Sequence, residues 1–333
     1  MLVNRRILMS VRAMIGLAVA TVLVAGVLSS SVNAQSSTAN TLKVSPVRTD
    51  IEVKAGASGE VPITITNLTG SDVLVSPIEN DFVQGDESGT PSIILDKDEF
   101  APTHSLKRFM QPLANVKVPA NGSTVVKVKI NVPANAQAGG YFGALRFAPT
   151  SPDDGGQVNL SASVASLILL TVPGPVTQQL NLTDFSLQQG SKAGTDFRTA
   201  NDLKVVFRFE NKGNIQLGPF GKVSVTQGDK LVYDYDFNQD TPRDVILPDG
   251  ARKWEVPLQK IGDFGYYTVH GTFTYGTENK TIEVERSFWV IPTAYIIGAI
   301  VALILIIGLV VWLIFFLKGR KRRTARRGAH RRR

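Results

Sequence analysis

Few residues of this 333-residue chain have the types and spacing that catalysis or metal binding requires. There is no cysteine, which excludes a thiol nucleophile and the usual zinc sites. The histidines His104, His270 and His330 are isolated in a loop, a predicted strand and the C-terminal tail, so no pair has metal or triad spacing. The carboxylates Asp153-Asp154 fall in a Gly-rich loop that is poorly suited to fixing geometry or shifting a pKa. We therefore expect a protein that is not an enzyme and has no cofactor.

One stretch has the spacing of a calcium loop. Its oxygen-bearing residues occupy every second position: Asp234, Asp236, Asn238 and Asp240. The sixth position is Gln239 instead of Gly, and the twelfth is Val245 instead of Glu. The acids also alternate with Tyr233, Tyr235 and Phe237, which is typical of a strand with acids on its wet face. We favour the strand and keep a calcium site as the alternative for these four residues.

The elements that position these residues are predicted to be β-strands. From Thr49 onward the chain has short alternating runs separated by Gly, Pro, Asn and Asp. The clearest run is Ser123 to Val132, in which Val126, Val128, Ile130 and Val132 share one face. We expect an all-β fold with two immunoglobulin-like β-sandwich domains, over residues 49–173 and 176–290, after a polar lead-in at 35–48. Pro173-Gly174-Pro175 marks the boundary between the two.

A tyrosine corner supports the sandwich prediction for the second domain. Asp263, Gly265 and Tyr267 match the Asp-x-Gly-x-Tyr pattern, in which the Tyr hydroxyl hydrogen-bonds to backbone a few residues upstream at the sixth strand. The first domain has a partial copy in Gly139 and Tyr141, with Gln137 in place of the Asp. Early strands of both domains also end in an Asn turn, at Asn67 and Asn211. We interpret the two domains as one sandwich repeated twice.

The C-terminal end predicts a membrane anchor. Residues 294–317 are 24 uncharged, mostly aliphatic residues, and about 20 apolar residues are enough for a helix to cross a bilayer. Trp289, Tyr295 and Trp312 lie near the two ends, where amphipathic rings favour the membrane interface. The tail at 318–333 has ten Lys or Arg and no acid, so by the positive-inside rule we expect it in the cytoplasm. The predicted localisation is a single-pass protein of the cell membrane with extracellular N-terminal domains.

The N-terminal residues 1–34 predict a secretory signal peptide. Arg5, Arg6 and Arg12 precede an uncharged stretch, and Val32-Asn33-Ala34 offers a cleavage site. An uncleaved anchor is the alternative. The two basic ends account for the net charge of +8, because the residues between them hold 23 basic and 28 acidic side chains, a net of −5. The exterior is therefore mildly acidic, and we expect no nucleic acid partner.

Three segments of the first domain form a recognisable set: the strand and turn Val61 to Gly70, the block Val118 to Ser123 with its strand to Pro133, and Gly139 to Phe147. In these segments the first domain resembles the peptidoglycan-binding domain of the WxL-interacting protein family of Gram-positive bacteria. The order of signal peptide, two sandwiches, C-terminal helix and basic tail is also similar. The resemblance implies attachment to the bacterial cell wall and a scaffold role toward other surface proteins.

Two functional hypotheses follow. The first is a non-catalytic surface binder, which contacts peptidoglycan or another cell-wall polymer, or surface proteins, as an adhesin or scaffold. The alternative is an envelope assembly factor, which holds exported client proteins by strand addition as a chaperone does. A fold of this class hosts many functions and does not choose between them.

Overall fold

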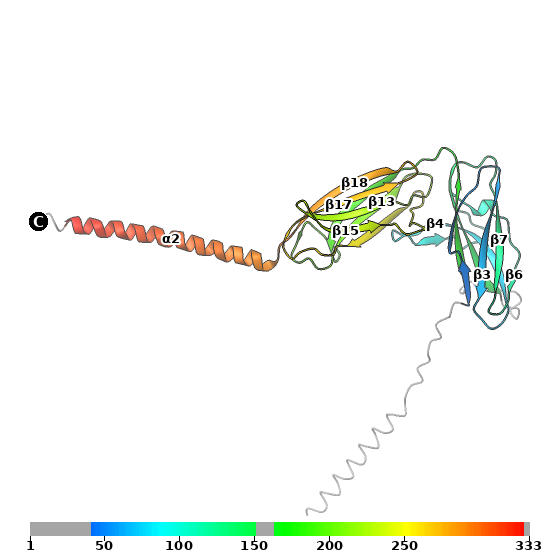
Figure 1. Cartoon of the computed structure of the whole chain (residues 1–333), viewed down its shortest axis with the longest axis horizontal. Coiled ribbons are helices and arrows are strands. Elements are labelled where there is room, and N and C mark those ends of the chain that lie inside the picture. Colours follow the sequence, from blue (N-terminus) through cyan, green and yellow to red (C-terminus); the bar gives the residue numbers. More distant parts are fainter. Residues whose placement is uncertain (1–40, 151–162, 330–333) are drawn as a thin grey trace, which may run out of the picture. The chain divides into compact units, whose positions relative to one another are not determined.

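The computed structural model describes residues 41–150 and 163–329, with side chains as far as Phe316 (Figure 1). These residues form β-strands β1 to β18, one 3-10 turn η1 (Lys107–Phe109) and one helix α2 (Thr293–Ala329). The described chain is therefore all-β apart from its C-terminal helix, as predicted. The proposed signal peptide lies outside the described residues.

The first sandwich pairs two sheets over one apolar core. One sheet has the order β1-β3-β7, and the other has the order β2-β9-β8-β4-β5 with β6 beside β4. Burial alternates in β7 as the sequence predicts, with Val126, Val128 and Ile130 in the core. The strand bounds are β1 (Leu42–Ser45), β2 (Arg48–Glu52), β3 (Ser58–Asn67), β4 (Val73–Gln84), β5 (Pro91–Ile93), β6 (Val116–Val118), β7 (Ser123–Asn131), β8 (Gly139–Thr150) and β9 (Val164–Val172).

The first sandwich begins earlier than the sequence predicts. The expected lead-in at 35–48 contains β1, whose Leu42 and Val44 are 1% and 7% exposed and belong to the core. β1 pairs antiparallel with β3, whereas β2 pairs parallel with β9 in the opposite sheet. The chain thus changes sheets between Ser45 and Arg48. A four-residue strand with two apolar residues is too short for its alternation to be recognised in the sequence.

The second sandwich has its own aromatic-rich core. Its sheets have the orders β11-β10-β13-β16 and β12-β18-β17-β14-β15, and Figure 1 shows β17 and β18 side by side. Its strands fall within the predicted second domain, residues 176–290. The bounds are β10 (Leu180–Gln189), β11 (Lys192–Ala193), β12 (Asp196–Phe197), β13 (Leu203–Asn211), β14 (Phe220–Gln227), β15 (Lys230–Phe237), β16 (Ala251–Pro257), β17 (Gly265–Tyr275) and β18 (Lys280–Val290).

The two sandwiches repeat one topology. β1-β3-β7 opposite β9-β8-β4 corresponds to β10-β13-β16 opposite β18-β17-β14. Asn67 and Asn211 occupy the same place in each and are both fully buried. Each Nδ2 group donates across the sandwich, to Val118 O and Pro119 O in the first and to Ile246 O in the second. Each buried amide thus ties one turn to another, because an unpaired amide inside the core would be costly.

The predicted tyrosine corner is present in the second sandwich. The Tyr267 side chain is buried, and its hydroxyl accepts a hydrogen bond from the Gly262 N–H at 3.1 Å and donates to Phe264 O at 3.4 Å. Gly265 has a φ of +156°, and a Cβ there would lie 2.4 Å from Gln227 Nε2. Asp263 is exposed at the start of this corner.

The partial copy in the first sandwich works in the same way. Gly139 has a φ of +151°, and the Tyr141 hydroxyl donates to Gln137 O at 2.9 Å. Partial burial raises the pKa of the Tyr141 phenol. The backbone of Gln137 therefore receives the bond although its side chain replaces the usual Asp.

The corner residues give a graded stability prediction. Tyr267→Phe removes only a hydroxyl and orphans its partner, so it should cost about 1 to 3 kcal/mol. Tyr266→Phe changes an exposed ring and should stay within about 0.5 kcal/mol. Gly265→Val should cost more than either, because a β-branched residue resists that φ and its side chain meets Gln227. Denaturant unfolding of the detergent-solubilised chain measures all three, and equal effects at Tyr266 and Tyr267 would contradict the corner.

Candidate functional site

The two sandwiches share a third apolar cluster, separate from their own cores. Phe82, Phe142, Ala144 and Leu169 come from β4, β8 and β9 of the first sandwich, and Leu247 comes from the segment before β16 of the second. Leu247 is 6% exposed and Phe142 is 2% exposed. Ile93, Leu167 and Val245 are partly buried against this cluster. Burial of these side chains holds the outer face of one sheet of the first sandwich against the second sandwich.

A hairpin of the first sandwich extends this contact. β4 continues beyond its pairing with β8 and forms a hairpin with β5 over residues 82–93. At its tip the Glu87 carboxylate pairs with Arg208 at 2.7 Å, and its carbonyl accepts from the Lys253 N–H at 2.7 Å. Gly89 lies directly against Arg252, since a Cβ there would be 2.3 Å from the guanidinium carbon. The tip of this hairpin, at residues 85–89, therefore contacts the second sandwich.

The corner of the first sandwich makes a further contact. The Gly140 N–H donates to Asn214 O at 2.8 Å, and Asn214 Nδ2 donates to Ala138 O at 2.9 Å. A Cβ at Gly139 would lie 2.8 Å from Asn214 O, so this approach requires glycine. Leu42–Arg333 accordingly forms one compact unit.

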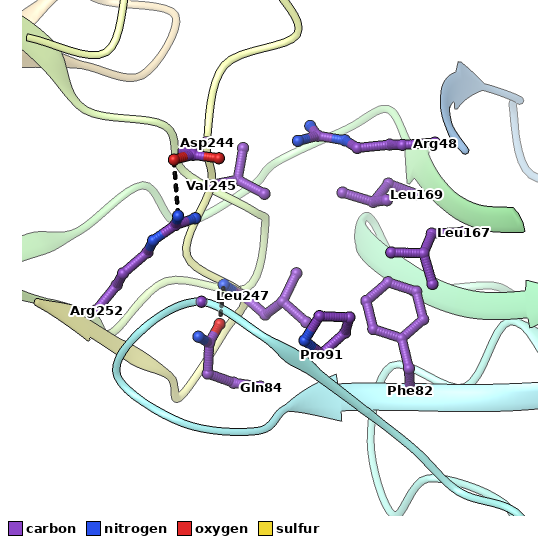
Figure 2. A pocket seen from close by; sticks show the side chains of 11 residues that line it. Arg48, Phe82, Gln84, Pro91, Leu167, Leu169, Asp244, Val245, Leu247 and Arg252 are labelled. Atoms are coloured by element: carbon purple, nitrogen blue, oxygen red, sulfur yellow. Dashed lines mark hydrogen bonds and ion pairs between the residues drawn. The ribbon is translucent and has the colours of Figure 1, made fainter. Parts of the chain in front are cut away.

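A hollow of about 180 Å³ remains where the hairpin, the first sandwich and the second sandwich meet. Figure 2 shows Phe82, Leu167 and Leu169 on the side of the first sandwich, and Arg252 turned toward Asp244 on the other. The floor is apolar, and the polar groups belong to Arg48, Gln84, Asp244 and Arg252. The lining residues are Arg48, Phe82, Gln84, Gly89, Pro91, Leu167, Leu169, Asp244, Val245, Leu247 and Arg252.

The guanidinium groups of the hollow keep spare donors. Arg48 donates from Nε and Nη2 to Asp50 Oδ1, and from Nη1 to Arg243 O at 2.8 Å. Arg252 donates to Asp244 Oδ2 at 2.7 Å. Its Nε is buried and has no partner among the described residues, so a ligand can reach only the terminal nitrogens of this guanidinium. Each guanidinium has five N–H donors and favours carboxylate and carbonyl oxygens. The hollow can therefore hold an apolar group that carries or adjoins a hydrogen-bond acceptor.

The hollow does not have the groups of a catalytic site. Its lining contains no Ser, Thr, Tyr, Lys or His, and its one carboxylate, Asp244, is paired with Arg252. A general base or nucleophile needs a free group of suitable pKa within reach of substrate. This set of side chains offers apolar contacts and hydrogen-bond donors.

The four residues of the calcium hypothesis do not converge on a common point. Asp234 and Asp236 share one face of β15 and flank Lys222 Nζ, at 3.1 and 3.5 Å. The hydrogen bond to Asp234, together with the negative charge of both carboxylates, raises the pKa of Lys222. Asn238 uses its amide to hold Pro219 O and Asp244 O, and Asp240 is exposed in the following turn. Within the described ranges no cluster of three or more metal-binding side chains occurs.

The described histidines lie in different sandwiches. His104 Nδ1 is 2.6 Å from Gly140 O, and His270 is 3.4 Å from Thr226 Oγ1 and 3.5 Å from Glu285. His330, Asp153 and Asp154 lie outside the described residues. The structure thus brings together no catalytic set from the histidines that it describes.

The hollow could not be predicted from the sequence because its walls come from distant segments. One feature of the sequence pointed to a contact here. Val245 and Leu247 are apolar within the mostly polar stretch 238–250, which shows no alternating pattern that would place them in a strand. Their burial against β9 and β4 becomes visible only when the two sandwiches are in contact.

No protein-family model matches the chain, and no curated protein matches it. Solved structures with some likeness include the class 5 fimbriae chaperone CfaA, with 11% identity over 74% of this chain and 98% of that chain, at a TM-score of 0.37. The CupB2 chaperone of Pseudomonas aeruginosa has 11% identity over 73% and 99%, at a TM-score of 0.32. The CsuC-CsuE chaperone-tip adhesion subunit complex of Acinetobacter baumannii gives 10% identity over 74% and 97%, at 0.33. At these values the likeness carries no conclusion about what the chain binds, and the resemblance to WxL-interacting proteins stays a prediction.

The shared apolar cluster should contribute more to the free energy of unfolding than the hairpin ion pair. Leu247→Ala removes a buried side chain and should lower the free energy of unfolding by about 2 to 5 kcal/mol. Glu87→Gln breaks an ion pair whose side chains are 50% and 30% exposed, so it should cost no more than about 1 kcal/mol. Denaturant unfolding of the solubilised chain tests the contrast. A larger cost at Glu87 than at Leu247 would mean that the ion pair, and not apolar burial, joins the sandwiches.

Proposed function

We propose that this protein is a membrane-tethered, non-catalytic binding protein that holds a segment of a protein partner in the hollow between its two sandwiches. The observation that carries the proposal is the combination of an apolar floor with two guanidinium groups, Arg48 and Arg252. Of the two hypotheses from sequence, this is closer to the assembly factor than to the adhesin.

The size of the hollow favours one part of an extended chain over a whole small molecule. Pockets for drug-sized ligands measure about 300 to 1,000 Å³, whereas this one is about 180 Å³. That volume suits one or two aliphatic side chains, with the guanidinium groups taking up a carboxylate or carbonyl of the same segment. We therefore assign it to an apolar residue next to an acceptor.

The lining favours a polypeptide over a wall glycan. Glycan hydroxyls must exchange water for protein hydrogen bonds, because burying an unpaired polar group is costly. Six of the eleven lining residues are Phe, Pro, Leu or Val, which offer no such bonds. Binding to peptidoglycan and the scaffold role implied by the family resemblance are kept as outcomes of the test below.

The tether is the C-terminal helix. Thr293–Phe316 is long and apolar enough to cross a membrane, with a mean hydropathy of 3.2 and no burial against the rest of the protein. The ten basic residues of the tail favour the cytoplasmic side for that end. We infer that both sandwiches face the outside of the cell membrane.

The topology can be tested with protease on intact cells. Both sandwiches should be removed and a small fragment that contains the helix and basic tail should stay with the membrane, detected by a C-terminal epitope tag. Permeabilised cells serve as the control, because the tag itself should then be lost. A full-length chain that resists protease on intact cells would contradict this orientation.

The hollow can be tested with defined peptides. Peptides that end in Leu or Val with a free C-terminal carboxylate should bind the solubilised full chain, and their C-amidated forms should bind more weakly. Arg48→Gln should weaken binding of the free acid about 10-fold or more, since a hydrogen bond to a charged group contributes about 1.5 to 3 kcal/mol. Calorimetry or fluorescence titration measures both effects.

The controls separate the possible ligands. Lys127→Gln removes an exposed cation of the first sandwich, on β7, and should leave peptide affinity unchanged. Leu167→Asp puts a charge into the floor and should abolish binding of both peptide forms. Unfolded pilin and tip-adhesin subunits, the partners named for the solved chaperones, and isolated cell walls are tested beside the peptides. If the chain is retained on isolated cell walls, and if Arg48→Gln and Leu167→Asp do not reduce that retention, the proposal is contradicted.

A further inference from the structure

Four large aromatic side chains lie exposed where the second sandwich meets α2. Phe264, Tyr266, Trp289 and Tyr295 are 50%, 46%, 41% and 60% exposed. They form two ring pairs: Phe264 stacks on Tyr295 with centroids 4.9 Å apart, and Tyr266 packs on Trp289 at 4.8 Å. The next residues along each strand, Tyr267 and Phe288, are buried in the core. We refer to the four exposed rings as the aromatic patch.

The backbone brings these rings together from three segments. Tyr266 and Trp289 are directly opposite each other in the β17–β18 pairing. The tyrosine corner at Tyr267 leaves Phe264 on the outside of the chain just before β17. β18 ends at Val290 and α2 begins at Thr293, so Tyr295 is in the first turn of the helix.

The depth of the rings follows from the helix. If α2 crosses the bilayer, the hydrocarbon core begins near Ala294, and Tyr295 lies at the interface. Phe264 contacts Tyr295 and must lie at a similar depth. Each headgroup layer is about 5 to 8 Å thick, and Tyr266 follows Phe264 by two residues, about 7 Å of extended chain at most. The Phe264–Tyr295 pair therefore falls within the outer headgroup layer, and the Tyr266–Trp289 pair lies no more than about one layer's thickness farther out.

The chemistry of the aromatic patch fits that layer. Trp and Tyr combine an apolar ring with a polar N–H or O–H and favour the boundary between lipid and water. Isolated exposed rings are ordinary on a protein surface, but a cluster that continues into an apolar helix marks an interaction surface. Only Ile291 and Pro292 separate β18 from α2, and proline restricts that connection further.

We propose that the aromatic patch docks this end of the second sandwich on the lipid surface of the outer leaflet, so that the sandwich is held on the membrane and does not swing freely on its helix. This inference rests on the proposed membrane tether, and it adds a lipid-binding surface formed by the folded domain. Phe264 and Tyr266 are the residues that the sandwich contributes.

The absence of cysteine allows a direct test with single labels. Asp263→Cys places an environment-sensitive fluorophore beside Phe264 while keeping all four rings. Glu278→Cys places it in the β17–β18 turn, ten residues along β17 from the membrane end, or about 33 Å. The full chain is reconstituted into phosphatidylcholine vesicles, and quenching by headgroup-linked and water-soluble quenchers is compared.

We expect the label at 263 to emit at shorter wavelength and to be quenched by the headgroup-linked quencher, and the label at 278 to respond to the water-soluble quencher alone. Phe264→Ser with Tyr266→Ser should return the label at 263 to a water-like signal, whereas Val125→Ser, an exposed apolar change in the first sandwich, should not. Unfolding curves of these variants should coincide, because the substituted side chains are exposed.

A third single label, at Ile304→Cys in the middle of α2, reports insertion of the helix through quenching by bromine-labelled acyl chains, because the emission of Trp254, Trp289 and Trp312 overlaps. If the label at 304 is quenched but the label at 263 stays water-like with all four rings present, the docking inference is wrong while the tether stands. If the label at 304 is not quenched, the tether and the docking inference are both wrong.

Discussion

Burial of Leu247 against the first sandwich is the contact on which the arrangement of the folded part depends. This one side chain of the second sandwich packs with Phe82, Phe142 and Leu169, on the face of their sheet that would otherwise meet water. This apolar face of the sheet must be covered, since its exposure would favour association with other chains. Covering it brings the hairpin tip, Arg48 and Arg252 to one place, and the hollow is the part of the contact that the side chains do not fill.

The repeat explains how such a contact can form between two copies of one sandwich. The Asn turn that ends an early strand is stabilised in both copies by a backbone N–H that donates to the Asn side chain, Asn67 in one copy and Asn211 in the other. In the second copy the turn also presents Asn214 to the corner glycines of the first. The same local structures therefore stabilise each sandwich and make part of the joint between them. Without disulfides, the stability of this chain depends on such buried hydrogen bonds and on its apolar cores.

The polar groups of the two candidate surfaces act differently. In the hollow, guanidinium groups keep unused donors in a partly buried apolar setting, where a hydrogen bond to a carboxylate gains strength from the reduced access of water. At the membrane end the relevant groups are rings whose polar edges need water and whose faces need lipid. One surface therefore suits a peptide segment and the other suits a bilayer interface.

The sequence by itself determined the class of fold, most of the strands, the tyrosine corner and the apolar helix. Each of these depends on local periodicity or on a motif of five residues, and so can be recognised without knowing what the chain packs against. Tyr267 lies inward and Tyr266 outward, as the alternation of side chains along a strand requires. Strands β1, β2, β6, β11 and β12 were not predicted, because strands of two to five residues are too short for alternation to be recognised.

Only the tertiary structure decided where the candidate site lies. Asp234 and Asp236 have the spacing of metal ligands, but the position of Lys222 on the neighbouring strand depends on the β14–β15 register, and its ammonium sits between them. The hollow joins Arg48 to Arg252 across 204 positions of the sequence, and the aromatic patch joins Phe264 to Tyr295. Such contacts are set by long-range packing, in which burial of apolar faces selects the partners, and no local pattern in the chain encodes which faces will meet.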